Sequence, residues 1–350
     1  METTKKIIFT GGWTGGHVTP IESLHNYIEE TSTNQYLWLW ERDSLEEDAA
    51  ERLGIEFRDI SAWKIRRYWD LRNFYEPLKN FTGIFESLYY IFRFKWEVVF
   101  SKGGFVSVPA VIAAFILRKK IYIHESDAVM WLANKITSKL AKKVFYSFPN
   151  DKTGKHIHSG PIVNPVMLDG VKSLSKTENQ RLTVLVIAGS QGSQNIFEEL
   201  VKMLPDCSDI DYHVIMGTNS DNELKAKLGN FWNVKVYGYI PQKELSKLYI
   251  TCDIAISRWS STLWELFYFG IHTIIIPLKA TGWNHQYHNG KYFEENYSSD
   301  LLDEDDNLSL EMFRRLQKYK DLRKTGLNLE WYLDGLNVIR DEIEEKKEDV

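Results

Sequence analysis

Residues 6–17 read Lys-Ile-Ile-Phe-Thr-Gly-Gly-Trp-Thr-Gly-Gly-His, a short apolar run that enters a glycine-rich loop. Ile21, Leu24 and Ile28 follow at helical spacing within residues 20–30, which predicts a strand–loop–helix unit. Glycines let the backbone approach a ligand, and the N–H groups at the start of a helix favour an anion. Taken alone, the loop could equally be a plain turn.

The pattern repeats along the chain. Further strands are predicted at residues 36–39, 98–101, 121–123 and 144–147. After a loop-rich passage, a second series begins with residues 182–187, a glycine-containing turn at 189–192 and a helix from about residue 194, and its later strands are predicted at 212–216, 234–237, 254–257 and 273–277. Short apolar runs alternating with helices are typical of parallel sheets. We predict an α/β protein with two Rossmann-like domains and an interdomain cleft, divided into residues 1–162 and 163–350, with the alternative that the terminal helix packs back on the first domain.

The charge and hydropathy of the chain disfavour two classes of protein, nucleic-acid binders that rely on a basic field and proteins that span a membrane. The formal net charge of −5 over 350 residues disfavours a nucleic-acid binder that relies on a basic field. The longest apolar stretch, residues 108–117, is about half of what a transmembrane helix needs. No signal peptide is indicated at the N-terminus. A cytoplasmic protein that does not span a membrane is therefore expected.

Residues 61–100 form a basic and aromatic segment, with seven Lys or Arg against four acids. A basic, aromatic, amphipathic surface suits anionic lipid headgroups. An ordinary pair of helices with bases at its surface is the alternative. We expect the region 61–120 to provide an anionic-membrane surface.

Polar residues follow predicted strands in the first half. His17 stands near a helix start, His124-Glu125-Ser126-Asp127 follows a strand, and Asn134 comes one helical stretch later. The carboxyl ends of parallel strands are the usual place for ligands. Asp127 could equally be a helix cap.

The second half carries a similar set. Glu265 lies after the strand at 254–257, where a carboxylate can accept both hydroxyls of a ribose, unless it is simply an exposed helical acid. Gln286 and Asn289 are three residues apart and share a helical face, and their amides suit sugar hydroxyls. His285 and His288 lack a nearby third ligand for a metal. Two glycine loops that face one cleft indicate a nucleotide-sugar enzyme.

Over roughly residues 5–320 the chain resembles the MurG family of glycosyltransferase family 28, which adds N-acetylglucosamine to lipid I in peptidoglycan synthesis. The stretches that carry the resemblance are Thr10–Pro20, Lys102–Pro109, His124–Val129 with Asn134, Val163–Val166 and Ala188–Gly192. The resemblance implies a GT-B fold, with the acceptor in the N-terminal domain and UDP-N-acetylglucosamine in the C-terminal one.

The implied activity is that of an inverting hexosyltransferase. The C4 hydroxyl of the muramoyl sugar of lipid I attacks C1 of the donor sugar, a base takes its proton, and lipid II forms. By the resemblance, His17 and Asp127 are catalytic, and Asp127, Asn134, Gly103 and Gly104 bind the acceptor. The donor-binding residues would be Thr14, Gly15, Ser190, Gln191, Ile240 at the uracil, Thr262 near the diphosphate, Glu265 at the ribose, and Gln286 and Asn289 at the sugar.

The resemblance also implies no cofactor and no tightly bound metal. It places the protein at the cytoplasmic face of the cell membrane as a peripheral enzyme of cell-wall biogenesis, cell shape and cell division. The alternatives are another GT-B glycolipid glycosyltransferase, of the diacylglycerol type, and a nucleotide-sugar-binding homologue without turnover.

The chain departs from the family at several tryptophans. It has 12 Trp and 21 Gly, and Trp stands where the family has Gly at Trp13, Trp40, Trp63, Trp131, Trp259 and Trp283. A bulky indole in a loop that approaches phosphate conflicts with close backbone contact. Our hypothesis is that these codons are UGA, read as glycine in the source organism. Asp127 likewise stands where the family usually has Asn.

Overall fold

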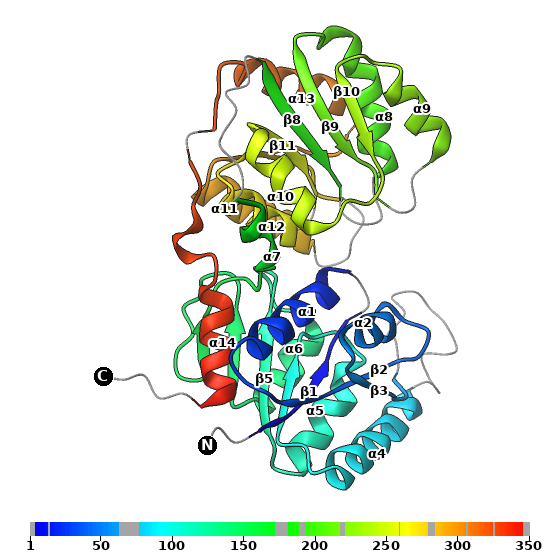
Figure 1. Cartoon of the computed structure of the whole chain (residues 1–350), viewed down its shortest axis with the longest axis vertical. Helices are drawn as coiled ribbons and strands as arrows, with labels where there is room; N and C mark the ends of the chain where they lie inside the picture. The colour runs from blue at the N-terminus through cyan, green and yellow to red at the C-terminus, as the bar shows by residue number, and fades with distance from the viewer. Residues whose placement is uncertain are drawn as a thin grey trace. The chain divides into compact units, whose positions relative to one another are not determined.

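The structure is a computed structural model, which describes residues 4–12, 15–62, 77–171, 181–188, 193–217, 221–258, 260–278, 284–305, 307–324 and 326–345. The chain divides into two compact units (Figure 1). The first unit comprises residues 1–163 together with the chain from Leu333 on, and the second unit comprises Asn164–Tyr332.

The first unit is built on a parallel sheet. Its described strands are β1 (Lys6–Thr10), β2 (Gln35–Trp40), β3 (Glu56–Asp59), β4 (Val98–Ser101), β5 (Lys120–Glu125), β6 (Lys143–Tyr146) and β7 (His156–His158). Their order across the sheet is β3-β2-β1-β4-β5-β6-β7. Ile7, Ile8 and Phe9 of the central strand β1 are fully buried, because a parallel sheet is covered on both faces and its inner strands are continuously apolar.

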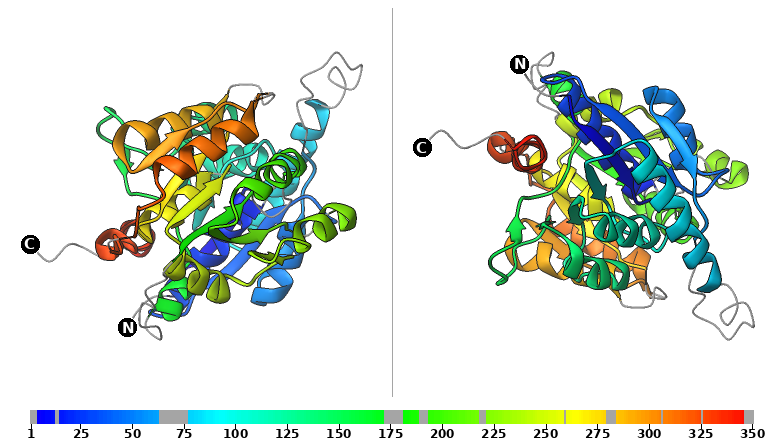
Figure 2. Two further views of the ribbon diagram at one scale, coloured as in Figure 1. Left: turned by 90° about the horizontal axis from the view of Figure 1, so that it is seen from above. Right: turned by 90° about the horizontal axis from the view of Figure 1, so that it is seen from below.

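Helices cover both faces of this sheet (Figures 1 and 2). They are α1 (Gly15–Glu29), α2 (Leu45–Leu53), α4 (Pro77–Arg93), α5 (Ser107–Ile116), α6 (Leu132–Thr137) and α14 (Asp334–Glu344). The last helix returns to the first unit, where the Tyr27 hydroxyl donates to Asn337 Oδ1 at 2.6 Å and the Tyr122 hydroxyl donates to the carbonyl of Glu342 at 2.9 Å.

The second unit repeats the architecture. Its strands are β8 (Leu182–Ile187), β9 (Ile210–Ile215), β10 (Val234–Tyr237), β11 (Ile254–Ser257), β12 (His272–Ile275) and β13 (Ser299–Leu301), in the order β10-β9-β8-β11-β12-β13. Its helices are α7 (Val166–Val171), α8 (Gln194–Met203), α9 (Asn222–Gly229), α10 (Gln242–Thr251), α11 (Ser260–Tyr268), α12 (His285–Asn296) and α13 (Leu308–Lys318). Every residue of the central strand β8 is buried.

The predicted α/β architecture with two Rossmann-like sheets is confirmed. The first helix begins earlier than predicted, at Gly15 rather than near Pro20. Three short strands, β3, β7 and β13, are not among the predicted ones. Each lies at an edge of its sheet, where the alternation or apolar run that marks a buried strand is weak.

The strand orders fix where each sheet can hold a ligand. In the first unit the chain reverses its direction of growth between the neighbours β1 and β4, and in the second unit between β8 and β11. At such a point, the loops after the two strands diverge to opposite faces and leave room beyond the carboxyl ends. A ligand site is therefore expected at the loops after β1, β4 and β5, and at those after β8, β11 and β12.

Candidate functional site

Two glycine loops meet at the carboxyl edge of the first sheet. Gly11 follows β1 with φ +119°, and a Cβ there would lie 2.8 Å from the backbone nitrogen of Lys102, directly after β4. Gly103 has φ +95°, and its Cβ would lie 2.8 Å from Asn134 Oδ1. Side chains are therefore excluded at both positions, because the φ values suit only glycine and the space is filled.

Glu125, the last residue of β5, organises the loop that follows it. Its Oε1 accepts a hydrogen bond from the backbone N–H of Asp127 at 3.1 Å, and its Oε2 accepts from the N–H of Trp131 at 3.0 Å and from Asn134 Nδ2 at 2.9 Å. Burial and then the charge of Asp127 raise the pKa of Glu125 to about 7. Glu125 is not among the predicted site residues, although it stands inside the His124–Asp127 motif.

His17 and Asp127, the predicted catalytic pair, belong to the same charge cluster. Burial and then the nearby positive charge of Lys102 lower the pKa of His17 to about 4, while Asp127 opposes that shift. His17 is therefore neutral at pH 7 and able to accept a proton. Asp127 Oδ2 accepts a hydrogen bond from the Trp131 indole N–H.

Three of the predicted acceptor-binding residues lie beside this pair. Gly103 and Gly104 follow β4, and Asn134 is buried on α6. The Asn134 amide nitrogen holds Glu125, and its Oδ1 has no hydrogen-bond partner among the described residues. Contact with an acceptor stays a prediction. Of the donor-binding residues predicted in this half, Gly15 begins α1 and Thr14 lies outside the described residues.

The predicted donor residues of the second unit follow the carboxyl ends of its strands. Ile240 comes after β10, and Thr262 and Glu265 lie on α11, directly after β11. Glu265 Oε2 accepts a hydrogen bond from the Tyr249 hydroxyl at 2.9 Å. Burial raises the pKa of Glu265 to about 7. Glu265 is therefore not the exposed helical acid of the alternative interpretation.

Gln286 and Asn289 begin α12, after β12. Gln286 Oε1 accepts from the backbone N–H of Leu278 at 2.8 Å, so this amide joins the start of α12 to the chain that follows β12. Asn289 is 1% exposed. Their predicted sugar contacts stay predictions, and Ser190 and Gln191, predicted at the donor diphosphate, lie outside the described residues.

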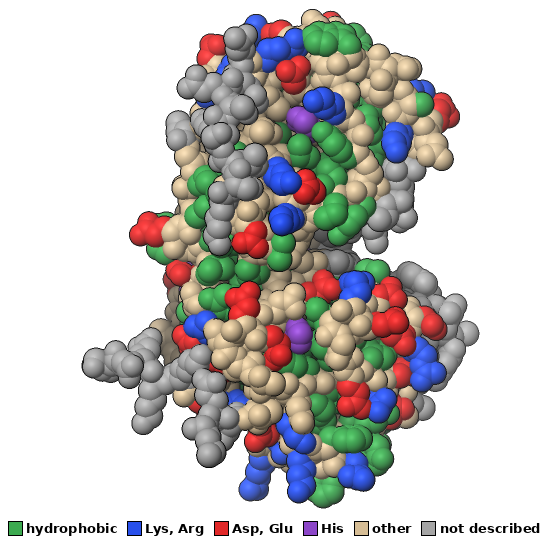
Figure 3. Space-filling model, viewed as in Figure 1, with side chains coloured by type: hydrophobic (Ala, Val, Ile, Leu, Met, Phe, Trp, Pro, Cys, Tyr) green, Lys and Arg blue, Asp and Glu red, His purple; other side chains and the backbone are tan. Residues whose placement is uncertain are grey.

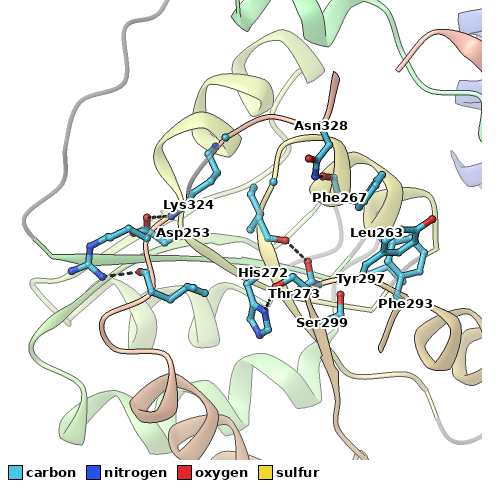
Figure 4. Close-up of a pocket in the computed structure, with 16 residues that line it drawn as sticks. Asp253, Leu263, Phe267, His272, Thr273, Phe293, Tyr297, Ser299, Lys324 and Asn328 are labelled. Atoms are coloured by element: carbon cyan, nitrogen blue, oxygen red, sulfur yellow. Dashed lines mark hydrogen bonds between the residues drawn. The ribbon is translucent and has the colours of Figure 1, made fainter. Parts of the chain in front are cut away.

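A cavity of about 240 Å³ in the second unit opens at the opposite, amino-terminal ends of β11, β12 and β13 (Figure 4). None of the predicted donor residues lines it. Its polar side chains are engaged within the fold: Asp253 accepts from the N–H groups of Thr183 and Lys324, and His272 contacts Ser298 Oγ at 2.8 Å and Asp300 Oδ2 at 3.1 Å. We therefore assign this cavity a structural role, distinct from the predicted donor site.

Metal-binding clusters and membrane-spanning helices are both absent from the described residues. In these ranges, no group of three or more His, Cys, Asp or Glu lies together in a way that could hold a metal ion. Within the same ranges, no helix is both long enough and apolar enough to cross a membrane. The absence of a bound metal or cofactor in the working enzyme stays a prediction.

Two of the six tryptophans assigned to recoded glycine lie in the described chain. Trp40 ends β2 and is 2% exposed, and Trp131 precedes α6 with φ −64°. Neither has a positive φ, so the backbone does not demand glycine at either position. Trp13, Trp63, Trp259 and Trp283 lie outside the described residues. We expect the gene to carry UGA at these six positions, and UGG at Trp13 and Trp63 would contradict the hypothesis.

Known protein families and relatives match nearly the whole chain. The model of the glycosyltransferase family 28 N-terminal domain matches residues 7–146, and that of the family 28 C-terminal domain matches residues 183–325. A Bacillus cereus relative named UDP-N-acetylglucosamine–N-acetylmuramyl-(pentapeptide) pyrophosphoryl-undecaprenol N-acetylglucosamine transferase 2 is 31% identical, covering 92% of this chain and 94% of its own. A Clostridium perfringens relative that bears the same name without the numeral is 33% identical, covering 95% of this chain and 93% of its own.

Solved structures agree on the fold. Acinetobacter baumannii MurG superposes with a TM-score of 0.77 at 20% identity, covering 97% of this chain and 99% of that chain. A putative UDP-N-acetylglucosamine 2-epimerase from Listeria monocytogenes superposes with a TM-score of 0.65 at 14% identity, covering 99% and 98%. The predicted GT-B class is confirmed. The chain belongs to glycosyltransferase family 28 and, within it, to the MurG family.

Proposed function

We propose that this protein transfers N-acetylglucosamine from UDP-N-acetylglucosamine to the C4 hydroxyl of the muramoyl sugar of lipid I and so forms lipid II. The observation that carries the proposal is sequence identity along nearly the whole chain with relatives named for this transfer. The cluster of His17, Glu125 and Asp127 at the carboxyl edge of the first sheet supports it, because the reaction needs a group that takes a proton.

The proposed reaction is a direct displacement with inversion at C1 of the donor sugar. The acceptor oxygen forms a bond to C1, the bond from C1 to the diphosphate oxygen breaks, and UDP leaves with the electron pair. The acceptor hydroxyl proton passes to a base, for which neutral His17 and the Asp127 carboxylate are the candidates. Fixed N–H groups at the glycine loops would stabilise the charge that develops on UDP.

The test is a comparison of acceptors. We expect purified protein to convert UDP-N-acetylglucosamine and lipid I in detergent to UDP and a disaccharide-bearing lipid, and to leave diacylglycerol unmodified. Turnover with diacylglycerol in place of lipid I would favour the glycolipid alternative, and donor binding without turnover on either would favour the non-catalytic one. Both outcomes would contradict the proposal.

The membrane contact is proposed for the surface of α4 and the end of α5. Phe81, Phe85, Tyr89 and Phe92 lie along one exposed stripe of α4, with Phe85 70% and Phe92 75% exposed. Phe115 and Ile116 at the end of α5 are exposed as well, and α4 packs on α5. Hydrophobic and basic side chains gather where α4 lies (Figure 3). Such a patch suits a peripheral site at the cytoplasmic face, where acidic headgroups attract bases.

Replacing both Phe85 and Phe92 with glutamate is expected to weaken binding to anionic vesicles by roughly tenfold or more, because burying one Phe side chain contributes about 1.5–3 kcal/mol. Vesicle sedimentation measures the effect. Trp232→Glu is the matched control, since Trp232 is an equally exposed aromatic residue of the second unit, 74% exposed. Unchanged vesicle binding by the double variant would contradict the assignment of this surface.

A further inference from the structure

Lys102 is a buried lysine at the carboxyl edge of the first sheet, where it directly follows β4. It is 2% exposed, although lysine is almost never fully buried unless it is paired. Its backbone N–H donates to the carbonyl of Thr10 at 2.9 Å, and Gly11 packs against it. Its Nζ donates to Ser126 Oγ. The side chain therefore joins the loop after β4 to the loop after β5, beside the loop after β1.

Titratable groups surround the Lys102 ammonium. The Glu125 and Asp127 carboxylates face it from the loop after β5 and favour its charged form. Two histidines also interact with the ammonium, His17 of α1 and His124 of β5. The charge of Lys102 contributes to the low pKa of each imidazole. Burial lowers the pKa of Lys102 itself to about 8, against the attraction of the two carboxylates. The cluster thus holds one cation that affects four titratable groups.

We propose that Lys102 is a positioning residue for the transfer reaction, whose ammonium, anchored on Ser126, ties the loop after β4 to the loop of Asp127 and so holds the candidate base groups in place. The proposal rests on the proposed function and deepens it. Lys102 is 2% exposed and its ammonium is engaged with Ser126, so in this proposal it acts through its neighbours. Burying a charge is costly unless it is compensated, and here the ammonium donates to Ser126 Oγ and is attracted by the Glu125 and Asp127 carboxylates.

The sign of the effect follows from Coulomb's law. A nearby positive charge disfavours the imidazolium form of His17. Removing the charge lets His17 bind a proton more readily, at a higher pH. The imidazole then gains its proton at a higher pH, so the acid limb of the activity profile moves upward while His17 stays neutral at pH 7.

The experiment compares the pH dependence of kcat for the wild type, Lys102→Met and Lys102→Arg. Methionine keeps the length without the charge, and arginine keeps the charge. We expect the acid limb of the profile to move up by about one pH unit in Lys102→Met and to stay in place in Lys102→Arg. We also expect the wild-type activity to fall above about pH 8, where Lys102 loses its proton, and Lys102→Met to lack that limb. Lys139→Met, an exposed lysine of the same unit, is the control and should match the wild type.

A second readout is independent of turnover. Titration of the His17 ring by NMR, with His17→Gln for assignment, should give a higher pKa in Lys102→Met than in the wild type, and Ser126→Ala should shift it in the same direction by less.

A uniform loss of kcat at every pH, with an unshifted His17 titration, would overturn the proposal in favour of a purely structural lysine. If the wild type transfers no sugar but His17 still shifts, the proposed function fails while the role of Lys102 in the cluster stands. If Lys102→Met does not fold, the Ser126→Ala and Lys102→Arg titrations decide, and an unshifted Ser126→Ala overturns the proposal.

Discussion

Replacing His17 with alanine is expected to lower kcat for transfer by roughly 10²- to 10⁴-fold, the usual contribution of a positioned general base. The imidazole is neutral at pH 7 because its pKa is lowered to about 4, so it can take the acceptor proton without first losing one. The KM for UDP-N-acetylglucosamine should change little, since the donor residues assigned to ribose and sugar lie in the second unit. Initial rates at saturating lipid I and saturating donor measure the effect.

Asp127→Asn is the matched comparison. The amide has nearly the size of the carboxylate without its charge, and the variant restores the residue that the family usually has. If His17 is the base, Asp127→Asn should retain kcat within about tenfold. The opposite pattern, a large loss in Asp127→Asn and a small one in His17→Ala, would assign the base to Asp127 and contradict the role given to His17.

Replacing Glu265 with alanine is expected to raise the KM for UDP-N-acetylglucosamine by roughly 10- to 100-fold, because hydrogen bonds to a charged group contribute about 1.5–3 kcal/mol. The carboxylate accepts the Tyr249 hydroxyl in the structure, which leaves its other oxygen for a ribose. Steady-state kinetics with varied donor at saturating lipid I measure the change. An unaltered KM would exclude Glu265 from the donor site.

The pH dependence of donor binding provides the control. Burial raises the pKa of Glu265 to about 7, so the carboxyl group is protonated below that pH and accepts hydroxyls less well. The KM for the donor should rise as pH falls below about 7 in the wild type, and Glu265→Gln should remove that dependence. Tyr249→Phe, which loses only the hydroxyl contact, should give a smaller increase in KM than Glu265→Ala.

The central strands and their loops can be predicted from the sequence because they carry strong local signals. The apolar runs of β1 and β8 and the glycines that follow β1 are enough to locate the sheets and the edge where ligands bind. β3 cannot be identified in this way, because its four residues, Glu56–Asp59, are mostly exposed and three are charged. An edge strand forms because it pairs with a neighbouring strand, and the local sequence pattern does not reveal that pairing.

The candidate site is predictable only in part. His17, Asp127 and Asn134 can be identified because polar residues after parallel strands meet at one edge. Glu125 and Lys102 stand in the same sequence motifs but receive no role there, since a sequence does not state which charges become buried. Burial is what makes them important, because it shifts the pKa of both side chains and strengthens their interaction with the charge of Asp127. The burial of Trp40 cannot be predicted from the local sequence either. The side chain is 2% exposed because of the position of β2 within the sheet.

The proposed transfer can be tested on the product that the wild-type protein makes from UDP-N-acetylglucosamine and lipid I. Mass spectrometry and NMR of the released sugar should find one added N-acetylglucosamine on C4 of the muramoyl residue, with the anomeric configuration opposite to that in the donor. Retention of configuration, attachment at another position, or release of UDP without a disaccharide would contradict the account.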